Sequence, residues 1–308
     1  VPSHDTIQRV MGMIRPENLQ QLQLKWQEML DSNEGEKLKK IICVDGKTMR
    51  SNKRKNTKPC HIVSAWSRED GYCLGQQAVE VKSNEITAIP KVLESIEIKG
   101  QVVTIDAMGT QTAIVETIRK RRADYVLAVK GNQGKLETDI RLYFEDAKVC
   151  EELKKGRGYK KTVEKAHGQT EIREYYQTGD VSWMDERGKW KGLKSIGMEK
   201  KTLRKGEEEK EEYRYYISSL GEDIELFSRA VRGHWAVESM HWHLDVTFKE
   251  DTNTTLDKIA AQNQNIIRKW CLSMLKLIEI RGTKMSLRRK RFNISFAPAQ
   301  FIEELMNI

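Results

Sequence analysis

The spacing of apolar residues changes several times along the first part of the chain, and each change predicts a new kind of element. Apolar positions three and four apart predict helices, while short β-branched runs bounded by polar turns predict strands. The predicted helices are 3–14, 16–29, 86–96 and 112–122, and the predicted strands are 40–46, 61–67, 72–81, 101–105 and 123–129. Three strands followed by alternating helices and strands predict an α/β fold with a mixed sheet flanked by helices.

Residues 135–222 interrupt this rhythm with a dense mixture of charges and glycines. Candidate strands lie at 159–166, 170–177, 193–203 and 212–219, and residues 204–207 are typical of a hairpin tip. The stretch is therefore interpreted as a β-rich insertion. After it, helices are expected at about 225–243, 256–280 and 298–306, with a basic loop at 281–291 before the last one.

These patterns divide the chain into five parts. They are a helical N-terminal segment (1–38), the first part of the α/β core (39–134), the β-rich insertion (135–223), core helices (224–280) and a basic loop with a C-terminal helix (281–308). Hydrophobic residues make up 38% of the chain, which is enough to build a substantial core.

Composition excludes several classes of protein. No apolar run approaches the roughly 18 residues of a membrane span, so no membrane is expected as a partner. Five cysteines without a C-x-x-C pair exclude a disulfide scaffold and a cysteine-rich zinc finger. The sequence starts without Met, as a fragment or processed chain does, and without a signal peptide, so a cytoplasmic, reducing location is expected. The net charge of +9 favours a polyanionic partner.

Two aspartates stand where predicted strands end. Asp45 ends the first strand and Asp106 the fourth, and both emerge at one edge if these strands are neighbours. Carboxylates held so close repel each other unless a divalent cation lies between them, and their hard oxygen atoms suit Mg²⁺ or Mn²⁺. A third carboxylate from a later helix would complete a two-metal site for in-line attack at phosphorus.

The helix expected after the insertion carries a polar stripe. His234, Glu238, His241 and Asp245 fall on one narrow face at 100° per residue, between two apolar shoulders. Such a helix packs on a core while it points four polar groups at a site. Glu238 is the member best suited to be the third metal ligand.

Each of these signals also has a simpler explanation. Asp45 followed by glycine is typical of a turn, and Asp106 can cap the helix that follows it. The spacing of His234, Glu238 and His241 can hold Zn²⁺ on one helix face, which leaves a zinc hydrolase open. The joint order of strand aspartate, strand aspartate and helix glutamate favours the metal-dependent phosphoryl-transfer site.

Several longer motifs run through the chain. They are residues 44–47, residues 104–108 with Thr110 and Gln111, residues 124–133, His167 and Gly168 with Glu171 and Arg173, and residues 232–251. The last one contains R-G-H-W and H-W-H-L-D-V and is the most specific. Together they resemble the DDE transposases of the H-repeat-associated insertion-sequence family, over roughly residues 1–280.

This resemblance implies a ribonuclease H-like core, a β insertion between the second aspartate and the glutamate, and Mg²⁺-dependent DNA cleavage followed by strand transfer from the released 3′-hydroxyl. It makes Asp45, Asp106 and Glu238 the catalytic triad that binds two metal ions, for which Mn²⁺ can substitute. The supporting residues of the site are Lys130, His234, His241 and Asp245. The expected partner is double-stranded DNA, at the element ends and at the target, bound by a homodimer in the bacterial nucleoid without a small-molecule cofactor.

Seven further residues are candidate contacts to DNA, chiefly to its phosphates. They are Lys47 at a strand end, His167 and Arg173 in the insertion, and the basic run of Arg288, Arg289, Lys290 and Arg291. An alternative from a different class is a catalytically silent DNA-binding relic of a transposase. Such a protein would bind DNA with a steep salt dependence but would not cleave it.

Overall fold

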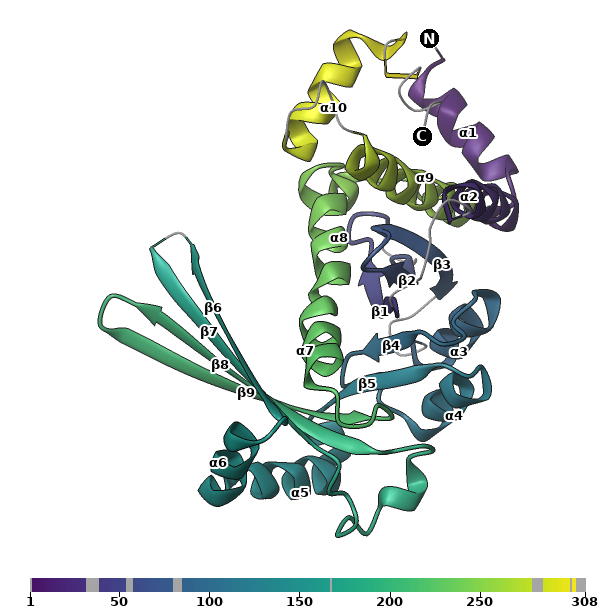
Figure 1. Ribbon diagram of the computed structural model, residues 1–308. Coiled ribbons are helices and arrows are strands. Elements are labelled where there is room, and N and C mark those ends of the chain that lie inside the picture. The colour runs from purple at the N-terminus through teal and green to yellow at the C-terminus, as the bar shows by residue number, and fades with distance from the viewer. Residues whose placement is uncertain are drawn as a thin grey trace. The chain divides into compact units, whose positions relative to one another are not determined.

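The computed structural model describes residues 2–31, 39–53, 58–79, 85–166, 168–278, 285–299 and 301–302 (Figure 1). The chain divides into two compact units. The first consists of Val1–Lys40, Asp45–Ile96 and Ala236–Ile308, and the second of Ile41–Val44 and Glu97–Trp235. Strand β1 (Ile41–Thr48) contributes its first half to the second unit and its second half to the first.

Helices make up most of the first unit. Its elements besides β1 are α1 (His4–Met13), α2 (Pro16–Asp31), β2 (His61–Ser67), β3 (Tyr72–Val79), α3 (Glu85–Ser95), most of α8 (Trp235–Val246), the short η4 (Glu250–Thr252), α9 (Lys258–Leu277) and α10 (Leu287–Phe296). Every residue of β2 is buried, and α9 packs against β3, α1 and α2. Inside this core Lys269 of α9 donates to Ser64 Oγ and Gln76 Oε1, which satisfies a fully buried ammonium group.

The second unit is built around strands. Its elements besides β1 are β4 (Val102–Ile105), α4 (Thr112–Lys120), β5 (Asp124–Val129), η2 (Gly131–Gln133), α5 (Gly134–Glu145), α6 (Ala147–Lys155), β6 (Tyr159–Ala166), β7 (Gln169–Thr178), η3 (Arg187–Lys189), β8 (Ser195–Lys205), β9 (Glu208–Ser218) and α7 (Ile224–Gly233). Figure 1 shows β6 with β7 and β8 with β9 as two long hairpins. The hairpin tip expected at 204–207 is confirmed, because β8 ends at Lys205 and β9 begins at Glu208.

The strands follow the order β3-β2-β1-β4-β5-β9-β8-β7-β6. Strands β1, β4 and β5 are parallel neighbours and nearly all of their paired residues are buried, as parallel strands covered on both faces require. The last pair between β1 and β4 is Val44 with Ile105. The expectation that the first and fourth strands are neighbours is therefore confirmed, and the mixed α/β fold with it.

The stretch interpreted as β-rich, 135–223, begins with two helices that the sequence pattern did not predict. Leu136, Ile140 and Phe144 recur every four residues along α5 and are all buried. Asp146 then begins α6, because its side chain accepts a hydrogen bond from Lys148 N. The charged residues between the apolar positions of α5 obscured its helical pattern in the sequence. Strands β6 to β9 occupy only the remainder of the stretch.

The C-terminal part differs from expectation in two places. The single helix predicted at 225–243 is two helices, α7 and α8, which meet at His234. The predicted basic loop at 281–291 is wrong from Leu287 onward, because α10 begins there with Ser286 as its cap. Most of the helix predicted at 298–306 lies outside the described residues. Among the described helices, none combines the length and apolarity that crossing a bilayer demands.

Candidate active site

Asp45 lies in the second half of β1, beside helix α8 of the same unit. Its Oδ2 atom lies 3.4 Å from Nδ1 of His241, and its side chain is 25% exposed. Glu238, one turn before His241 on α8, is exposed to solvent. Two members of the predicted triad thus come from β1 and α8, and a histidine of the predicted stripe contacts one of them.

The glycine after Asp45 belongs to the strand, so the turn interpretation of this pair is wrong. A Cβ atom at Gly46 would lie 2.6 Å from Glu85 Cδ and would overlap both Glu85 Oε1 and His61 Nε2. These side chains form a buried chain of hydrogen bonds, with Thr48 Oγ1 2.8 Å from His61 Nδ1 and His61 Nε2 3.1 Å from Glu85 Oε1. Glycine is required next to Asp45 because this network fills the space where a side chain would lie.

Lys47 occupies a cluster of acidic groups, which corrects its predicted role as a DNA contact. Its Nζ atom lies 2.7 Å from Asp245 Oδ1, 3.2 Å from Asp251 Oδ1 and 3.4 Å from Glu250 Oε2. Burial lowers the pKa of Lys47, but the negative charges of Glu250, Asp245 and Asp251 outweigh burial and raise the pKa overall. Lys47 therefore joins the end of β1 both to Asp245 of α8 and to Glu250 and Asp251 in the segment after that helix.

Asp106 directly follows β4 in the second unit and is exposed. Its Oδ1 atom accepts a hydrogen bond from Gly109 N at 3.1 Å. Helix α4 starts at Thr112, and its N-cap residue is Gln111. Asp106 therefore does not cap the helix, and its hydrogen bond with Gly109 lies within the loop between β4 and α4. Because Ile105 pairs with Val44, Asp106 and Asp45 are the residues that come directly after the last paired positions of two parallel strands.

Three side chains join the loop after β4 to the end of β5 and to the turn that follows it. Thr110 Oγ1 donates to Ala128 O at 2.6 Å, Asn132 Nδ2 to Ala107 O at 2.6 Å, and Gln133 Nε2 to Thr110 O at 2.8 Å. Sequence reasoning noted these positions as parts of motifs but gave them no role. Their hydrogen bonds hold the backbone around Asp106 in place. Lys130, which was predicted to support the site, is exposed at the end of β5.

His234 caps the C-terminal end of α7. Its Nδ1 atom lies 3.1 Å from Thr104 Oγ1 on β4. Burial, and then the positive charge of Arg214, lower the pKa of His234 to about 4. Among the described residues, no group of three or more His, Cys, Asp or Glu side chains is placed to hold a metal ion as the structure stands, and this holds for the carboxylate triad as well as for the zinc alternative.

The low pKa of His234 predicts a pH-dependent stability. An ordinary imidazole takes up its proton near pH 6.5 in the unfolded chain, whereas His234 stays neutral in the folded chain down to about pH 4. The stabilising contribution is complete above pH 6.5 and is lost as the pH falls to 4, by about 3 kcal/mol. Denaturant unfolding across this range should show a smaller loss in His234→Gln than in the native chain. His4→Gln, a change at an exposed position on α1, should match the native curve. Superimposable curves for all three proteins would contradict the prediction.

Arg173 is buried, which corrects its predicted role as a DNA contact. Only 2% of its side chain is exposed, and it forms ion pairs with Glu199 and Glu171. Its guanidinium also lies 5.2 Å from the ring centre of Trp235. Lys201, Arg214 and Arg232 approach the same ring within 6 Å. Arg173 therefore stabilises the packing of β7 against Trp235, which follows the end of α7.

Of the four basic residues at the start of α10, one is buried and three are exposed. Lys290 is buried and donates to the carbonyl oxygen atoms of Leu275 and Ile278, so its predicted contact to DNA is wrong. Arg288, Arg289 and Arg291 are exposed. His167, the remaining predicted DNA contact, lies outside the described residues.

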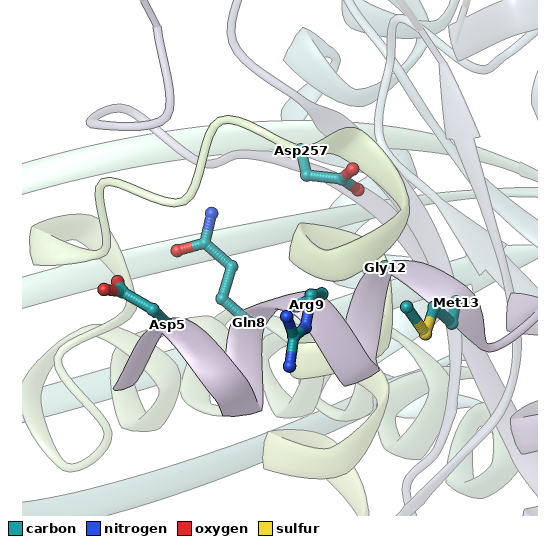
Figure 2. Close-up of a pocket in the computed structure, with 6 residues that line it drawn as sticks. All are labelled: Asp5, Gln8, Arg9, Gly12, Met13 and Asp257. Atoms are coloured by element: carbon teal, nitrogen blue, oxygen red, sulfur yellow. The ribbon is translucent and has the colours of Figure 1, made fainter. Parts of the chain in front are cut away.

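A cavity of about 400 Å³ in the first unit contains none of the predicted site residues. Figure 2 shows its lining, which comes from one side of α1 and from Asp257 at the start of α9. Asp257 caps α9 by accepting a hydrogen bond from Ala260 N. Gly12 lies against that carboxylate, because an added Cβ would be 3.3 Å from Asp257 Oδ2. This cavity lies where α1 packs on α9, and none of the predicted catalytic or DNA-binding residues lines it.

Comparison with known proteins gives consistent matches. A family model described as "Transposase DDE domain" matches residues 36–274. "Putative transposase YncI" of Escherichia coli O157:H7 is 38% identical over 99% of this chain and 78% of its own length. "H repeat-associated putative transposase YhhI" of Escherichia coli K12 is 37% identical over 94% of this chain and 77% of its own length. Among solved structures, a piggyBac transposase synaptic complex with hairpin DNA matches with a TM-score of 0.39 and 11% identity, over 82% of this chain and 51% of the other.

Proposed function

Because the chain belongs to the transposase DDE domain family, we propose that it cleaves DNA at the ends of a mobile element and joins the released 3′-hydroxyl to target DNA. Asp45, Asp106 and Glu238 are the proposed catalytic residues. The observation that carries this proposal is the register of β1 and β4: Asp45 and Asp106 directly follow the paired residues Val44 and Ile105. Adjacent strands lie about 4.8 Å apart, so this register supports a pair of carboxylates.

Glu238 is proposed as the third carboxylate because of its place on α8. The side chain of His241, one turn later on the same helix, contacts Asp45 within the first unit. Side chains three residues apart lie on the same face of a helix, so Glu238 and His241 point in a common direction. Strand order and the parallel pairing of β1, β4 and β5 support a ribonuclease H-like core as the scaffold.

The donor set suits a hard divalent cation. Asp45, Asp106 and Glu238 all offer carboxylate oxygen atoms, the ligands that Mg²⁺ and Mn²⁺ prefer, and both Asp106 and Glu238 are exposed. These residues would hold the ions. When bound, two such ions stabilise both the attacking and the leaving oxygen atoms of a phosphodiester.

The neighbouring residues act by positioning the carboxylates. His241 orients the carboxylate of Asp45, and the packing of Gly46 against His61 and Glu85 fixes the backbone that carries it. The hydrogen bonds from Thr110, Asn132 and Gln133 hold the loop of Asp106. Such preorganisation matters because small displacements of catalytic groups are costly.

Double-stranded DNA is the proposed partner. The excess of nine positive charges favours a polyanion, and the exposed Arg288, Arg289, Arg291 and Lys130 are the remaining candidate phosphate contacts. A homodimer on DNA is proposed because two element ends must be brought together for joining.

Removal of divalent cations tests the proposed activity. The purified chain should nick supercoiled plasmid DNA in Mg²⁺ or Mn²⁺, and EDTA should abolish nicking while salt-sensitive DNA binding persists. Addition of excess Mg²⁺ should restore nicking. Plasmid that is bound but stays intact in both metals would favour the catalytically silent relic. Nicking that survives EDTA would contradict the metal-dependent mechanism.

A further inference from the structure

In the second unit, the edge of the sheet opposite Asp106 carries exposed cations. Strands β4, β5, β9 and β8 are consecutive neighbours. The first residue of β4 pairs with the first of β5, the end of β9 pairs beside the start of β5, and the last residue of β9 pairs with the first of β8. The connections before β4, β5 and β8 therefore meet at one edge. Each holds one exposed cation, Lys99, Arg122 or Lys194, and these three residues are called the basic edge.

Contacts between the connections confirm that they lie together. The backbone N–H of Gly100 donates to Arg122 O at 2.9 Å, which joins the turns before β4 and β5. Gly192, close to Lys194, packs on Arg119, because an added Cβ would lie 2.9 Å from Arg119 Nε. Neighbouring strands are about 4.8 Å apart, so β4 and β8 are separated by about 14 Å. That distance corresponds to about four nucleotides of a DNA strand.

The charges of the basic edge are available to a ligand. Among the described residues, none of its three side chains forms a hydrogen bond or an ion pair. The nearby carboxylate of Asp124 is already neutralised by Arg119. Residues 187–194, in the connection before β8, hold four cations and no acidic residue. This part of the surface therefore has an excess of positive charge.

Arg122 has a backbone conformation that favours glycine. Helix α4 ends in a Schellman motif, in which Ala123 N donates to Ile118 O at 3.2 Å and Arg122 N donates to Arg119 O at 3.1 Å. Arg122 is the left-handed residue of this motif, with a φ of 58°. Glycine is the usual residue there, because a side chain strains the left-handed conformation. The chain thus keeps an exposed cation where the backbone favours glycine, and such a strained position indicates a function.

The composition and the place of the basic edge indicate its ligand. No large apolar side chain is exposed among residues 97–101, 119–124 and 187–194, whereas protein partners are usually bound through aromatic and apolar groups. Lysine and arginine without such groups are typical of contacts to a nucleic acid backbone. Strand β5 (Asp124–Val129) rises about 3.3 Å per residue, so the basic edge lies about 20 Å from the edge that carries Asp106.

We infer that the basic edge binds the phosphate backbone of a DNA segment away from the bond that is cut. The choice of DNA among polyanions rests on the proposed function, in which the chain must hold target DNA as well as an element end. The contact reads no base sequence. It also requires no divalent cation, because the carboxylates lie at the opposite edge.

Salt-dependent binding tests this inference without knowledge of the element ends, because phosphate contacts are independent of sequence. The probe is a fluorescein-labelled duplex of random sequence, followed by anisotropy over a series of salt concentrations in EDTA. A triple variant, Lys99→Gln, Arg122→Gln and Lys194→Gln, should weaken binding about tenfold to a hundredfold. It should also reduce the slope of log K against log salt by two to three, since each phosphate contact contributes about 0.9.

The matched control removes the same charge from another surface of the second unit. Lys148, Lys154 and Lys155 are exposed on α6, and their joint replacement by glutamine should change the affinity less than about twofold. An equal loss in this control would overturn the inference, because it would indicate a diffuse effect of net charge. An unchanged slope in the first triple variant would also overturn it.

Arg122→Gly separates binding from folding. Glycine relieves the strained backbone, so the thermal unfolding midpoint should rise by about 2 °C, while binding weakens about threefold and the slope falls by about one. Arg122→Lys keeps the charge and should retain the slope. Full binding by Arg122→Gly would remove Arg122 from the contact, since this protein is folded and lacks only the cation.

The outcomes for the basic edge and for the proposed function are distinguishable. A loss of slope in the triple variant supports the basic edge even if the native chain never nicks plasmid DNA. Metal-dependent nicking by the native chain, together with an unchanged slope in the triple variant, would overturn the basic edge and leave the proposed function intact. A loss that appears only when Ca²⁺ replaces EDTA would assign these cations to DNA held at the carboxylates and would overturn the inference.

Discussion

Asp106→Asn and Glu238→Gln should each lower the rate of metal-dependent DNA cleavage by at least about 10³-fold. The change replaces a charged oxygen ligand by an amide of the same shape, and a loss of this size corresponds to about 4 kcal/mol of transition-state stabilisation. Both side chains are exposed, so the substitutions should leave the thermal unfolding midpoint nearly unchanged. The measurement is the initial rate of plasmid nicking in saturating Mg²⁺.

The matched control is Glu116→Gln, on the exposed surface of α4 in the same unit as Asp106. Its carboxylate pairs only loosely with Lys120, at 3.7 Å, and should contribute nothing to cleavage. A rate in Asp106→Asn equal to that of the control would remove Asp106 from the catalytic residues. Equal rates in both triad variants and the control would refute the triad altogether.

Gly46→Ala should destabilise the protein by about 3 kcal/mol and lower the thermal unfolding midpoint by about 5–10 °C. The added Cβ atom would lie 2.6 Å from Glu85 Cδ and would push apart Glu85 and His61, a buried hydrogen-bonded pair. Strand β1 is buried on both sides of the sheet up to Val44, so its backbone has little room to move away. Thermal and denaturant unfolding both measure the loss.

Gly134→Ala is the corresponding control. Gly134 lies in the first turn of α5 with helical dihedral angles, and an added Cβ would meet nothing within 4 Å. Alanine there should stabilise the helix by about 0.5–1 kcal/mol. If Gly46→Ala is as stable as the native chain, the close packing beside Asp45 is not what requires glycine at this position.

The two predictions also distinguish the catalytic role proposed for Asp106 from the structural role of Gly46. Asp106→Asn should abolish cleavage in a stable protein, whereas Gly46→Ala should lower stability and displace Asp45 at the same time. A stabilised Gly46→Ala protein, measured at low temperature, should still cleave DNA more slowly than the native chain, because the backbone next to Asp45 has moved. Full activity under those conditions would show that Asp45 tolerates this displacement.

Much of the scaffold could be predicted from local patterns. The β-branched runs before Asp45 and Asp106 indicated two strands, and the structure pairs these strands in parallel. Helix α5 was missed, because its apolar positions Leu136, Ile140 and Phe144 are diluted by charged residues between them. Helix α10 was missed for a similar reason, since a basic run was taken for a solvated loop.

The roles of individual basic residues could not be predicted in the same way. Lys47, Arg173 and Lys290 all look like surface cations in the sequence, yet each is held inside the protein by internal partners. One partner of Lys47, Asp251, lies 204 residues further along the chain. No local spacing reveals such a pair.

By itself, the sequence determined that Asp45 and Asp106 follow the β-branched runs of two strands and that Glu238 shares a helix face with His241, because these relations depend on short-range spacing. It also determined the family, through motifs that contain these residues. Only the tertiary structure decided which cations are held inside the protein and which remain exposed. Ion pairs and cavities arise from side chains brought together across long stretches of chain, and their charges are decided by the packing around them.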